Sequence, residues 1–191
     1  MSTEEMEVKN DSKSGLREII RMVLYFAAIL AITFCIIEFV GQRTVVSGSS
    51  METTLSDGDN LIIDKLTYRF SDPQRFDIIV FPYQYEEDTY YIKRIIGLPG
   101  EKVRIDEEGN IYINDVLLEE DYGYETIKNP GIAASTITLG EDQYFVLGDN
   151  RNNSTDSRFE NVGLIKRSEI IGRAVLRVFP FTDFTLLTNE D

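Results

Sequence analysis

The chain has 191 residues, enough for one ordinary domain with a small extension, and a formal net charge of −14. This acidity, with no basic footprint, argues against nucleic acid as a partner. With Cys35 as the single cysteine and no histidine, the sequence predicts no disulfide framework, no metal site and no cofactor.

An apolar run begins after Arg21 and extends over residues 22–40. At about 1.5 Å per residue it spans roughly 28 Å as a helix, close to the thickness of a hydrocarbon core. We therefore predict a transmembrane anchor over 22–40, preceded by a cytoplasmic tail over 1–21. A buried core helix fits less well, because the run is long and apolar on all sides. A cleaved signal peptide would have a shorter apolar region, and residues 39–43 make a poor cleavage site.

The distribution of lysine and arginine predicts the orientation of this anchor. Four basic residues precede the run, whereas Arg43 follows it and the next cation is Lys65. The positive-inside rule places the N-terminus in the cytoplasm and residues 41–191 outside. The four preceding residues are Lys9, Lys13, Arg17 and Arg21.

Beyond residue 41 the pattern is one of short β-type runs separated by turn signals. The expected fold class is mainly β: an N-terminal transmembrane helix followed by an antiparallel β-sheet catalytic domain. A small inserted β-region is expected at about residues 101–140, and a helical turn at 166–170. The predicted strands are 43–47, 61–66, 77–81, 90–97, 102–105, 111–113, 136–139, 144–147 and 173–179.

Ser50 follows the first predicted strand and a glycine, Gly48. A serine in this position can present its Oγ to solvent while its own backbone N–H faces an incoming carbonyl, as in an oxyanion hole. An ordinary turn is the alternative interpretation of the segment. Because the chain has no histidine, a nucleophilic serine would need a lysine, a carboxylate or an N-terminal amine as its base.

Lys93 lies inside the predicted strand 90–97, among apolar and aromatic residues. A free lysine has a pKa of about 10.4, and a useful base needs that pKa lowered by roughly three units. Burial can supply such a shift, and the adjacent cation of Arg94 can add to it. The alternative is a lysine whose aliphatic stem follows the sheet while its amine reaches solvent at the edge.

The polar run 148–158 alternates carboxylate, amide, hydroxyl and guanidinium groups. It is either a solvated loop or a supporting shell around a reactive site. In the second case Asp156 pairs with an arginine, and a hydroxyl orients the lysine amine.

Five segments of the chain, in order after the apolar run, resemble the sequence boxes of bacterial type I signal peptidase (leader peptidase). The resemblance covers about residues 20–180 and is of the single-anchor, Gram-positive-like type. The segments begin at Ser50-Met51, Gly58-Asp59, Asp77-Ile78, Lys93-Arg94 and Gly148-Asp149.

This resemblance implies a role for each matching residue. Ser50 would be the nucleophile, with its backbone N–H in the oxyanion hole, and Lys93 the general base. Ser154 would orient the lysine amine. Structural support would come from Asp156, Arg158, Arg94 and Asp149. Small apolar pockets for the Ala-x-Ala end of a signal peptide would be lined by Val46, Met51, Leu55, Tyr91 and Ile92.

The chain departs from the family pattern at three positions. Thr53 replaces a usual proline, which loosens the turn after the nucleophile. Glu101 replaces a common aspartate. Gly48 stands where some members carry a serine whose hydroxyl completes the oxyanion hole.

The resemblance implies a serine endopeptidase with a Ser/Lys dyad that removes signal peptides from secreted preproteins. Its expected partners are those signal peptides and membrane lipid, with neither nucleic acid nor metal. It is expected in the plasma membrane as a single-pass protein, with an extracytoplasmic catalytic domain over 41–191.

Three alternative functions differ from this one in a recognisable feature. A self-cleaving Ser/Lys repressor would be soluble and carry an N-terminal DNA-binding domain. The endoplasmic-reticulum type of signal peptidase commonly uses histidine in place of the lysine. The third alternative is a protein without enzymatic activity: an anchored, non-catalytic β-domain, either a scaffold or a degenerate homologue. Such a protein would leave a preprotein unprocessed.

Overall fold

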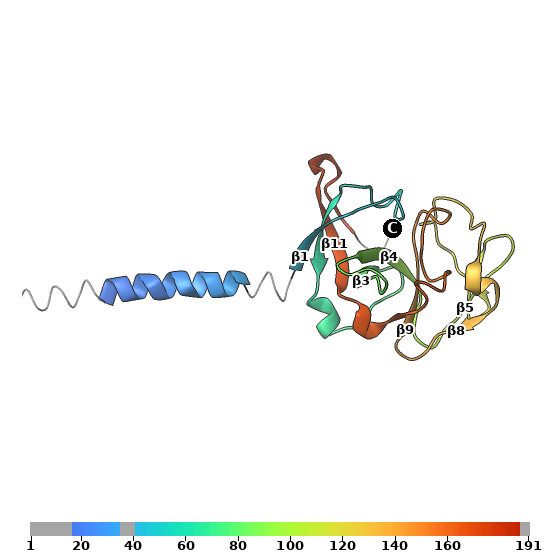
Figure 1. Cartoon of the computed structure of the whole chain (residues 1–191), viewed down its shortest axis with the longest axis horizontal. Coiled ribbons are helices and arrows are strands. Elements are labelled where there is room, and N and C mark those ends of the chain that lie inside the picture. The colour runs from blue at the N-terminus through green and yellow to red at the C-terminus, as the bar shows by residue number, and fades with distance from the viewer. Residues whose placement is uncertain (1–16, 35–40, 188–191) are drawn as a thin grey trace, which may run out of the picture. The chain divides into compact units, whose positions relative to one another are not determined.

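The computed structural model describes residues 17–34 and 41–187 (Figure 1). The chain divides into two compact units, Met1–Val40 and Gly41–Asp191. Residues 17–34 of the first unit are helical, whereas the end of the predicted anchor, 35–40, lies outside the described residues. Within the described ranges, no helix combines the length and apolarity needed to cross a bilayer.

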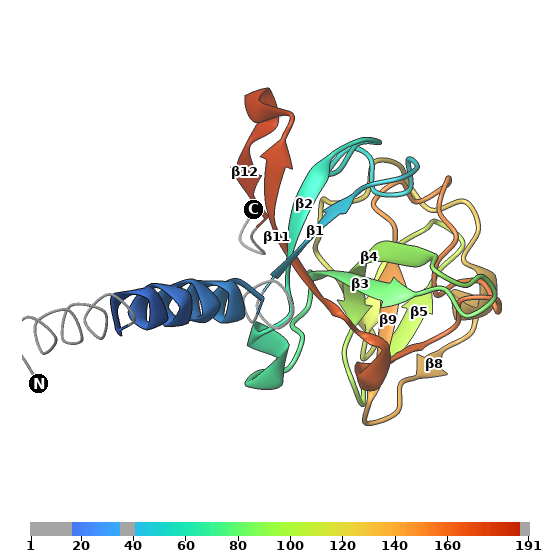
Figure 2. The same ribbon diagram turned by 60° about the vertical axis from the view of Figure 1, so that its left-hand side comes forward.

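The second unit is built on an eight-stranded sheet whose pairings are all antiparallel. The strand order is β1-β2-β11-β3-β4-β9-β10, with β12 paired to β11 as a projecting hairpin (Figure 2). The bounds are β1 Gly41–Val45, β2 Asn60–Asp64, β3 Ile78–Pro82, β4 Tyr90–Gly97, β9 Gln143–Leu147, β10 Ile165–Lys166, β11 Gly172–Phe179 and β12 Thr185–Leu186.

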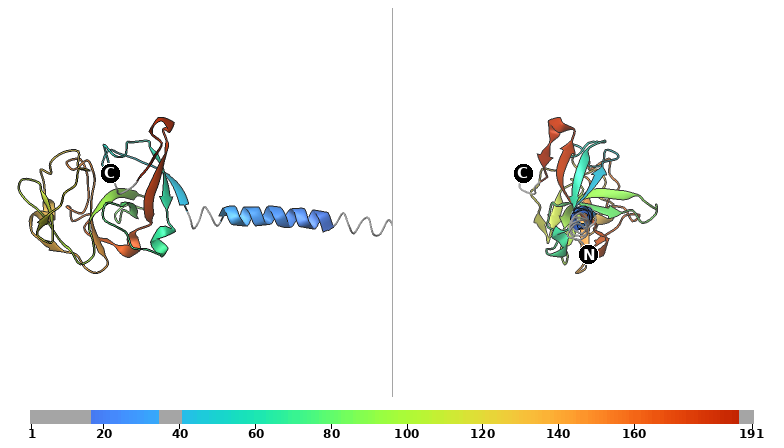
Figure 3. Two further views of the ribbon diagram at one scale, coloured as in Figure 1. Left: turned by 180° about the vertical axis from the view of Figure 1, so that it is seen from behind. Right: turned by 90° about the vertical axis from the view of Figure 1, so that its left-hand side faces the viewer.

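A second, four-stranded sheet occupies the region of the predicted insertion, in the order β7-β6-β5-β8. In Figure 1, and from behind in Figure 3, it lies across the second unit from β1. Its core includes Val103 and Ile105 and continues onto Phe145 of β9. The bounds are β5 Lys102–Ile105, β6 Ile111–Ile113, β7 Val116–Leu117 and β8 Ile137–Thr138.

Short 3-10 turns connect several of these strands: η1 Thr67–Arg69, η2 Gly131–Ala134, η3 Arg167–Glu169 and η4 Phe181–Asp183. The turn expected at 166–170 corresponds to η3.

The prediction of a mainly antiparallel β-domain is confirmed. Strands 90–97, 102–105 and 111–113 have the predicted bounds, and the other predicted strands differ by one or two residues at an end. The sequence missed β7, β10 and β12. Each has only two residues, too few to show alternation, and unlike the two-residue β8 none lies within a predicted run.

One hydrophobic cluster holds the segment that follows β1 against β4. It joins Val46 and Met51, after β1, to Leu61 of β2 and Val80 of β3, with Ile92 of β4 packed against it. Burying these side chains fixes the segment after β1 over the first half of β4.

Candidate active site

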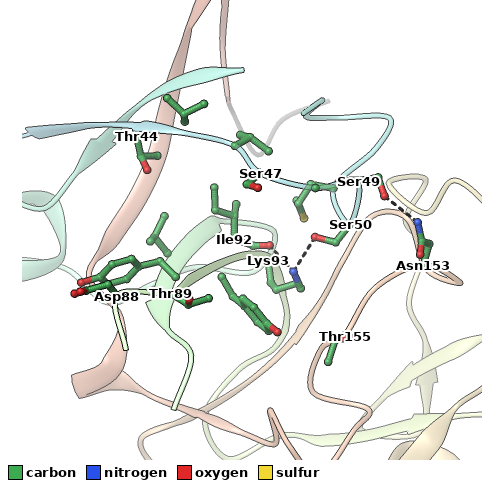
Figure 4. Close-up of a pocket in the computed structure, with 17 residues that line it drawn as sticks. Thr44, Ser47, Ser49, Ser50, Asp88, Thr89, Ile92, Lys93, Asn153 and Thr155 are labelled. Carbon is green, nitrogen blue, oxygen red and sulfur yellow. Dashed lines mark hydrogen bonds between the residues drawn. The ribbon is translucent and has the colours of Figure 1, made fainter. Parts of the chain in front are cut away.

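A cavity of about 560 Å³ lies between the segment after β1 and the first half of β4 (Figure 4). Ser50 and Lys93 both line it, and their side chains point toward each other. The full lining is Thr44–Met51, Val80, Asp88–Lys93, Asn153 and Thr155.

The turn that carries Ser50 is held from two sides. Gly48 has φ +93°, a conformation that glycine adopts without a steric penalty, and its N–H donates to Asp57 Oδ1 at 2.8 Å. On the other side, the backbone N–H of Asn150 donates to the Ser50 carbonyl at 3.1 Å. The nucleophile turn is therefore fastened to the loop that follows β9.

Ser49 receives two further hydrogen bonds from this loop. The side-chain amide of Asn150 donates to the Ser49 carbonyl at 3.1 Å, and that of Asn153 donates to Ser49 Oγ at 2.8 Å (Figure 4). These contacts limit the movement of the neighbouring Ser50.

Lys93 approaches Ser50 from β4. Its Nζ lies 2.9 Å from Ser50 Oγ, donates to the Ile92 carbonyl at 2.9 Å and sits 4.9 Å from the centre of the Tyr91 ring. The residue is 3% exposed. The lysine amine is thus hydrogen-bonded to the serine hydroxyl at a buried position.

Burial of Lys93 lowers the pKa of its amine to about 8, against the opposing effect of the Asp156 and Asp149 carboxylates. The sequence-based expectation that Arg94 contributes to this shift is wrong, because desolvation is the only lowering cause. Strand alternation turns Arg94 to the other face of β4. There the Asp149 carboxylate neutralises its charge.

Arg94 and Asp149 form a two-point ion pair, with Nε–Oδ1 at 2.9 Å and Nη2–Oδ2 at 2.7 Å. Both side chains are almost completely buried. Thr54 Oγ1 donates to the same carboxylate at 2.6 Å, and the guanidinium lies 3.7 Å from the centre of the Tyr122 ring. The pair therefore links β4, the turn after Ser50 and the loop after β9.

Asp156 and Arg158 form a second buried pair within the loop, with Nε–Oδ1 at 2.8 Å. Asp156 Oδ2 also accepts the N–H of Gly148 at 3.1 Å. The interpretation of 148–158 as a supporting shell therefore agrees better with the structure than a solvated loop does.

The hydrogen bond expected between Ser154 and Lys93 is not formed. Ser154 Oγ is buried and has no hydrogen-bond partner among the residues that the structure describes. It lies in a crowded place, because a Cβ added to Gly148 would meet Ser154 Oγ at 2.2 Å and the Ser50 carbonyl oxygen at 2.4 Å.

Four of the five predicted pocket residues, Val46, Met51, Tyr91 and Ile92, line the cavity. Leu55 does not, which corrects the prediction. Its side chain is 0% exposed and belongs to the hydrophobic cluster beneath the cavity. The resemblance identifies a matching apolar position but does not separate a residue of the cavity wall from one in the layer below it.

A family model described as signal peptidase, peptidase S26, matches residues 19–179. The chain belongs to this signal peptidase family. The resemblance to bacterial type I signal peptidase seen in the sequence is thereby confirmed, and so is its class as an S26 serine peptidase.

Two curated relatives and one solved structure illustrate the similarity. A probable signal peptidase I-2 of Synechocystis is 42% identical over 170 residues, covering 86% of this chain and 74% of the relative. Signal peptidase I P of Bacillus subtilis subsp. natto is 33% identical over 175 residues, covering 88% and 91%. The crystal structure of a signal peptidase I from Enterococcus faecalis is 37% identical, covers 55% of this chain and 98% of that one, and superposes with a TM-score of 0.44.

Several residues of this signal peptidase site received no role from the sequence. Asn150 and Asn153 lie in the polar run 148–158, where their amides could have been suspected of holding a neighbouring turn. Asp57 lies in a turn signal. Val80 lies in the family-like segment that begins at Asp77, but it received no role, because a valine is expected in any buried strand.

Proposed function

We propose that this signal peptidase uses Ser50 as nucleophile and Lys93 as general base to remove signal peptides from preproteins at Ala-x-Ala-like sites. The observation that carries the proposal is the 2.9 Å contact between Lys93 Nζ and Ser50 Oγ inside a cavity. A serine acts as nucleophile only when a base takes its proton, and Lys93 is the base in contact.

In the proposed mechanism, neutral Lys93 accepts the hydroxyl proton as Ser50 Oγ attacks the scissile carbonyl. The resulting ammonium gives that proton to the leaving amine of the mature protein, which completes the acyl-enzyme. Lys93 then takes a proton from a water that attacks the ester, and returns it to Ser50 as the signal peptide leaves.

The neutral form of Lys93 suits this role. A neutral amine has one lone pair, which accepts the Ser50 hydroxyl, and two N–H groups. One of these donates to the Ile92 carbonyl. In the proposed reactive arrangement Ser154 Oγ accepts the other, which requires its side chain to move into hydrogen-bond distance of Nζ; the support is that this oxygen is buried without a partner within the described ranges.

The two buried ion pairs have a positioning role in this proposal. Arg94–Asp149 joins the strand of the base to the turn after the nucleophile, and Asp156–Arg158 shapes the loop that contacts Ser50. None of these four residues needs to touch the substrate.

The edge of β4 offers a place for the signal peptide. Its first half, Tyr90–Lys93, pairs with β3 on one side, whereas β9 pairs only with residues 94–97 on the other. In the described part of the chain, no strand therefore pairs with Tyr90–Lys93 on the side opposite β3. An extended peptide can add there through main-chain hydrogen bonds, with alternate side chains entering the cavity.

Cleavage should select small residues just before the cut and two positions upstream. The pocket formed by Val46, Met51 and Ile92 accommodates a methyl group, and a larger side chain there costs overpacking strain of about 1–3 kcal/mol. Preproteins with Ala, Gly, Ser, Val, Leu and Phe before the cut should show kcat/KM highest for Ala and, by the same free energy, about 5- to 150-fold lower for Phe.

N-terminal sequencing of the products checks that the cut falls at the intended bond, and the Ser50→Ala enzyme serves as a blank. Similar kcat/KM for Ala and Phe would refute the small pocket even if Ser50 proved essential.

Activity should rise with pH. Only the neutral amine of Lys93 accepts a proton, and its folded pKa is about 8. The rate should therefore be low at pH 6, half-maximal near pH 8 and level above pH 9. Chelators should leave it unchanged. A rate independent of pH between 6 and 9 argues against a lysine base.

We also propose that residues 22–40 anchor the chain in the plasma membrane as a single pass, with 1–21 cytoplasmic and 41–191 extracytoplasmic. The support is the apolar composition of the run and the lysine and arginine residues before it. Processing activity should remain with the membrane pellet after alkaline carbonate extraction. Its release into the supernatant would exclude an integral anchor.

A further inference from the structure

A second cavity, of about 180 Å³, adjoins the active-site cavity. Three residues, Thr44, Val80 and Tyr90, line both cavities, so the second continues the first. We propose that the second cavity is a subsite for the side chain of the fifth residue before the cut, position −5, and that it takes an apolar side chain. This inference rests on the proposed function. The remaining lining residues are Gln42, Ile63, Lys65 and Ile171.

The direction of the flanking segments places this cavity upstream of the cut. The chain runs from Thr44 toward Ser50 on one wall and from Thr89 toward Lys93 on the other, and Figure 4 shows Thr44 and Thr89 at the end away from Asn153. The apolar residues for positions −1 and −3 lie between Thr44 and the dyad. The opposite end is polar, with Ser49, Asn153 and Thr155. The signal peptide therefore extends toward Thr44 and Tyr90.

Strand geometry then gives the position. A strand advances about 3.3 Å per residue and alternate side chains share a face, so −1, −3 and −5 point the same way. Position −5 is four residues upstream of −1, a distance of roughly 13 Å along the strand. If the peptide runs in the same direction as β4 and −1 lies beside Lys93, then −5 lies beside Thr89 and Tyr90. On β4, Ile92 and Tyr90 share one face. Ile92 lines the active-site cavity, and Tyr90 also lines the second cavity.

The lining determines the chemistry of the occupant. Ile63 is 2% exposed, Val80 is 6% exposed and Ile171 packs against the same cluster, so these three residues give the cavity an apolar wall. A dry apolar cavity of about 150 Å³ can hold benzene, so this volume accommodates a leucine or phenylalanine side chain. Lys65 is a lining residue, and its positive charge disfavours lysine or arginine at −5.

The test uses the full-length membrane enzyme and preproteins with alanine at −1 and −3 and with Ala, Val, Leu, Phe or Lys at −5. We expect kcat/KM for Leu to exceed that for Ala about tenfold, which corresponds to about 1.4 kcal/mol. Lysine should be cleaved no faster than alanine. A Leu:Ala ratio near one would overturn the subsite.

Two variants fill the cavity from different sides. Ile171→Phe fills it from its apolar wall, and Gln42→Phe fills it from an exposed position on β1. Each should lower the Leu:Ala ratio to about one. Ile62→Phe is the matched control: Ile62 neighbours Ile63 on β2 but faces the other way, so its ratio should stay near ten.

Folding of each variant is checked by circular dichroism, and Gln42→Phe keeps the test valid if Ile171→Phe misfolds. A tenfold preference that survives in Gln42→Phe would overturn the assignment to this cavity. Failure of the unmodified enzyme to cleave any of the five preproteins would overturn the proposed function and the subsite together. Equal cleavage of all five preproteins would overturn the subsite alone.

Discussion

Replacing Ser50 or Lys93 by alanine should abolish preprotein cleavage, with kcat lowered about a thousandfold or more. The reason is that Oγ and Nζ, 2.9 Å apart, act in one proton transfer. Because either change removes the whole step, the double variant should be no slower than each single variant. Rates come from single-turnover cleavage of a preprotein, and circular dichroism confirms the fold. Additive losses in the double variant would show that the two residues act independently.

The conservative variant Lys93→Arg shows whether Lys93 acts as a proton acceptor or only as a positive charge. A guanidinium keeps its proton near neutral pH, so this variant should be inactive at every pH between 6 and 10. A role for Lys93 as a simple cation would be preserved by arginine. Substantial cleavage by Lys93→Arg would therefore exclude Lys93 as the general base.

The second large effect is expected on stability. Asp149→Ala should lower the free energy of unfolding by roughly 3–5 kcal/mol, because it leaves the charge of Arg94 buried without its carboxylate partner. The two side chains are 2% and 0% exposed, so bulk solvent does not reach the Arg94 guanidinium. Denaturant unfolding of the detergent-solubilised protein measures the change.

Two controls test whether the loss of stability comes from the unpaired charge of Arg94 or only from the loss of a contact. The double variant Arg94→Met with Asp149→Leu removes both charges and should regain much of the stability. Lys128→Ala breaks the exposed pair with Glu125, leaves the hydrogen bond from Asn152 to Glu125 in place, and should give no measurable change. If Asp149→Ala unfolded at the same denaturant concentration as the unmodified protein, the pair would have no stabilising role.

The strands near the site could be predicted because their signals are local. In 90–97 the β-branched and aromatic residues, bounded by turns, gave the same limits as β4 in the structure. The same local pattern singled out Lys93, a charged residue in a run that is otherwise suited to burial. The two-residue strand β10 left no pattern because two positions cannot show alternation, whereas β8, equally short, was found through its flanking residues 136 and 139.

The sequence by itself determined the mainly antiparallel β-domain, the family and the candidates Ser50 and Lys93, because residue types and spacing along the chain carry that information. Only the tertiary structure decided which side chains meet. It paired Arg94 with Asp149, 55 positions away, kept Ser154 out of hydrogen-bond contact with Lys93 and placed Leu55 below the cavity. It also formed the second cavity from five separate segments. The physical reason is that burial and pairing depend on which layers pack together, and side-chain patterns within one strand do not specify the strand opposite.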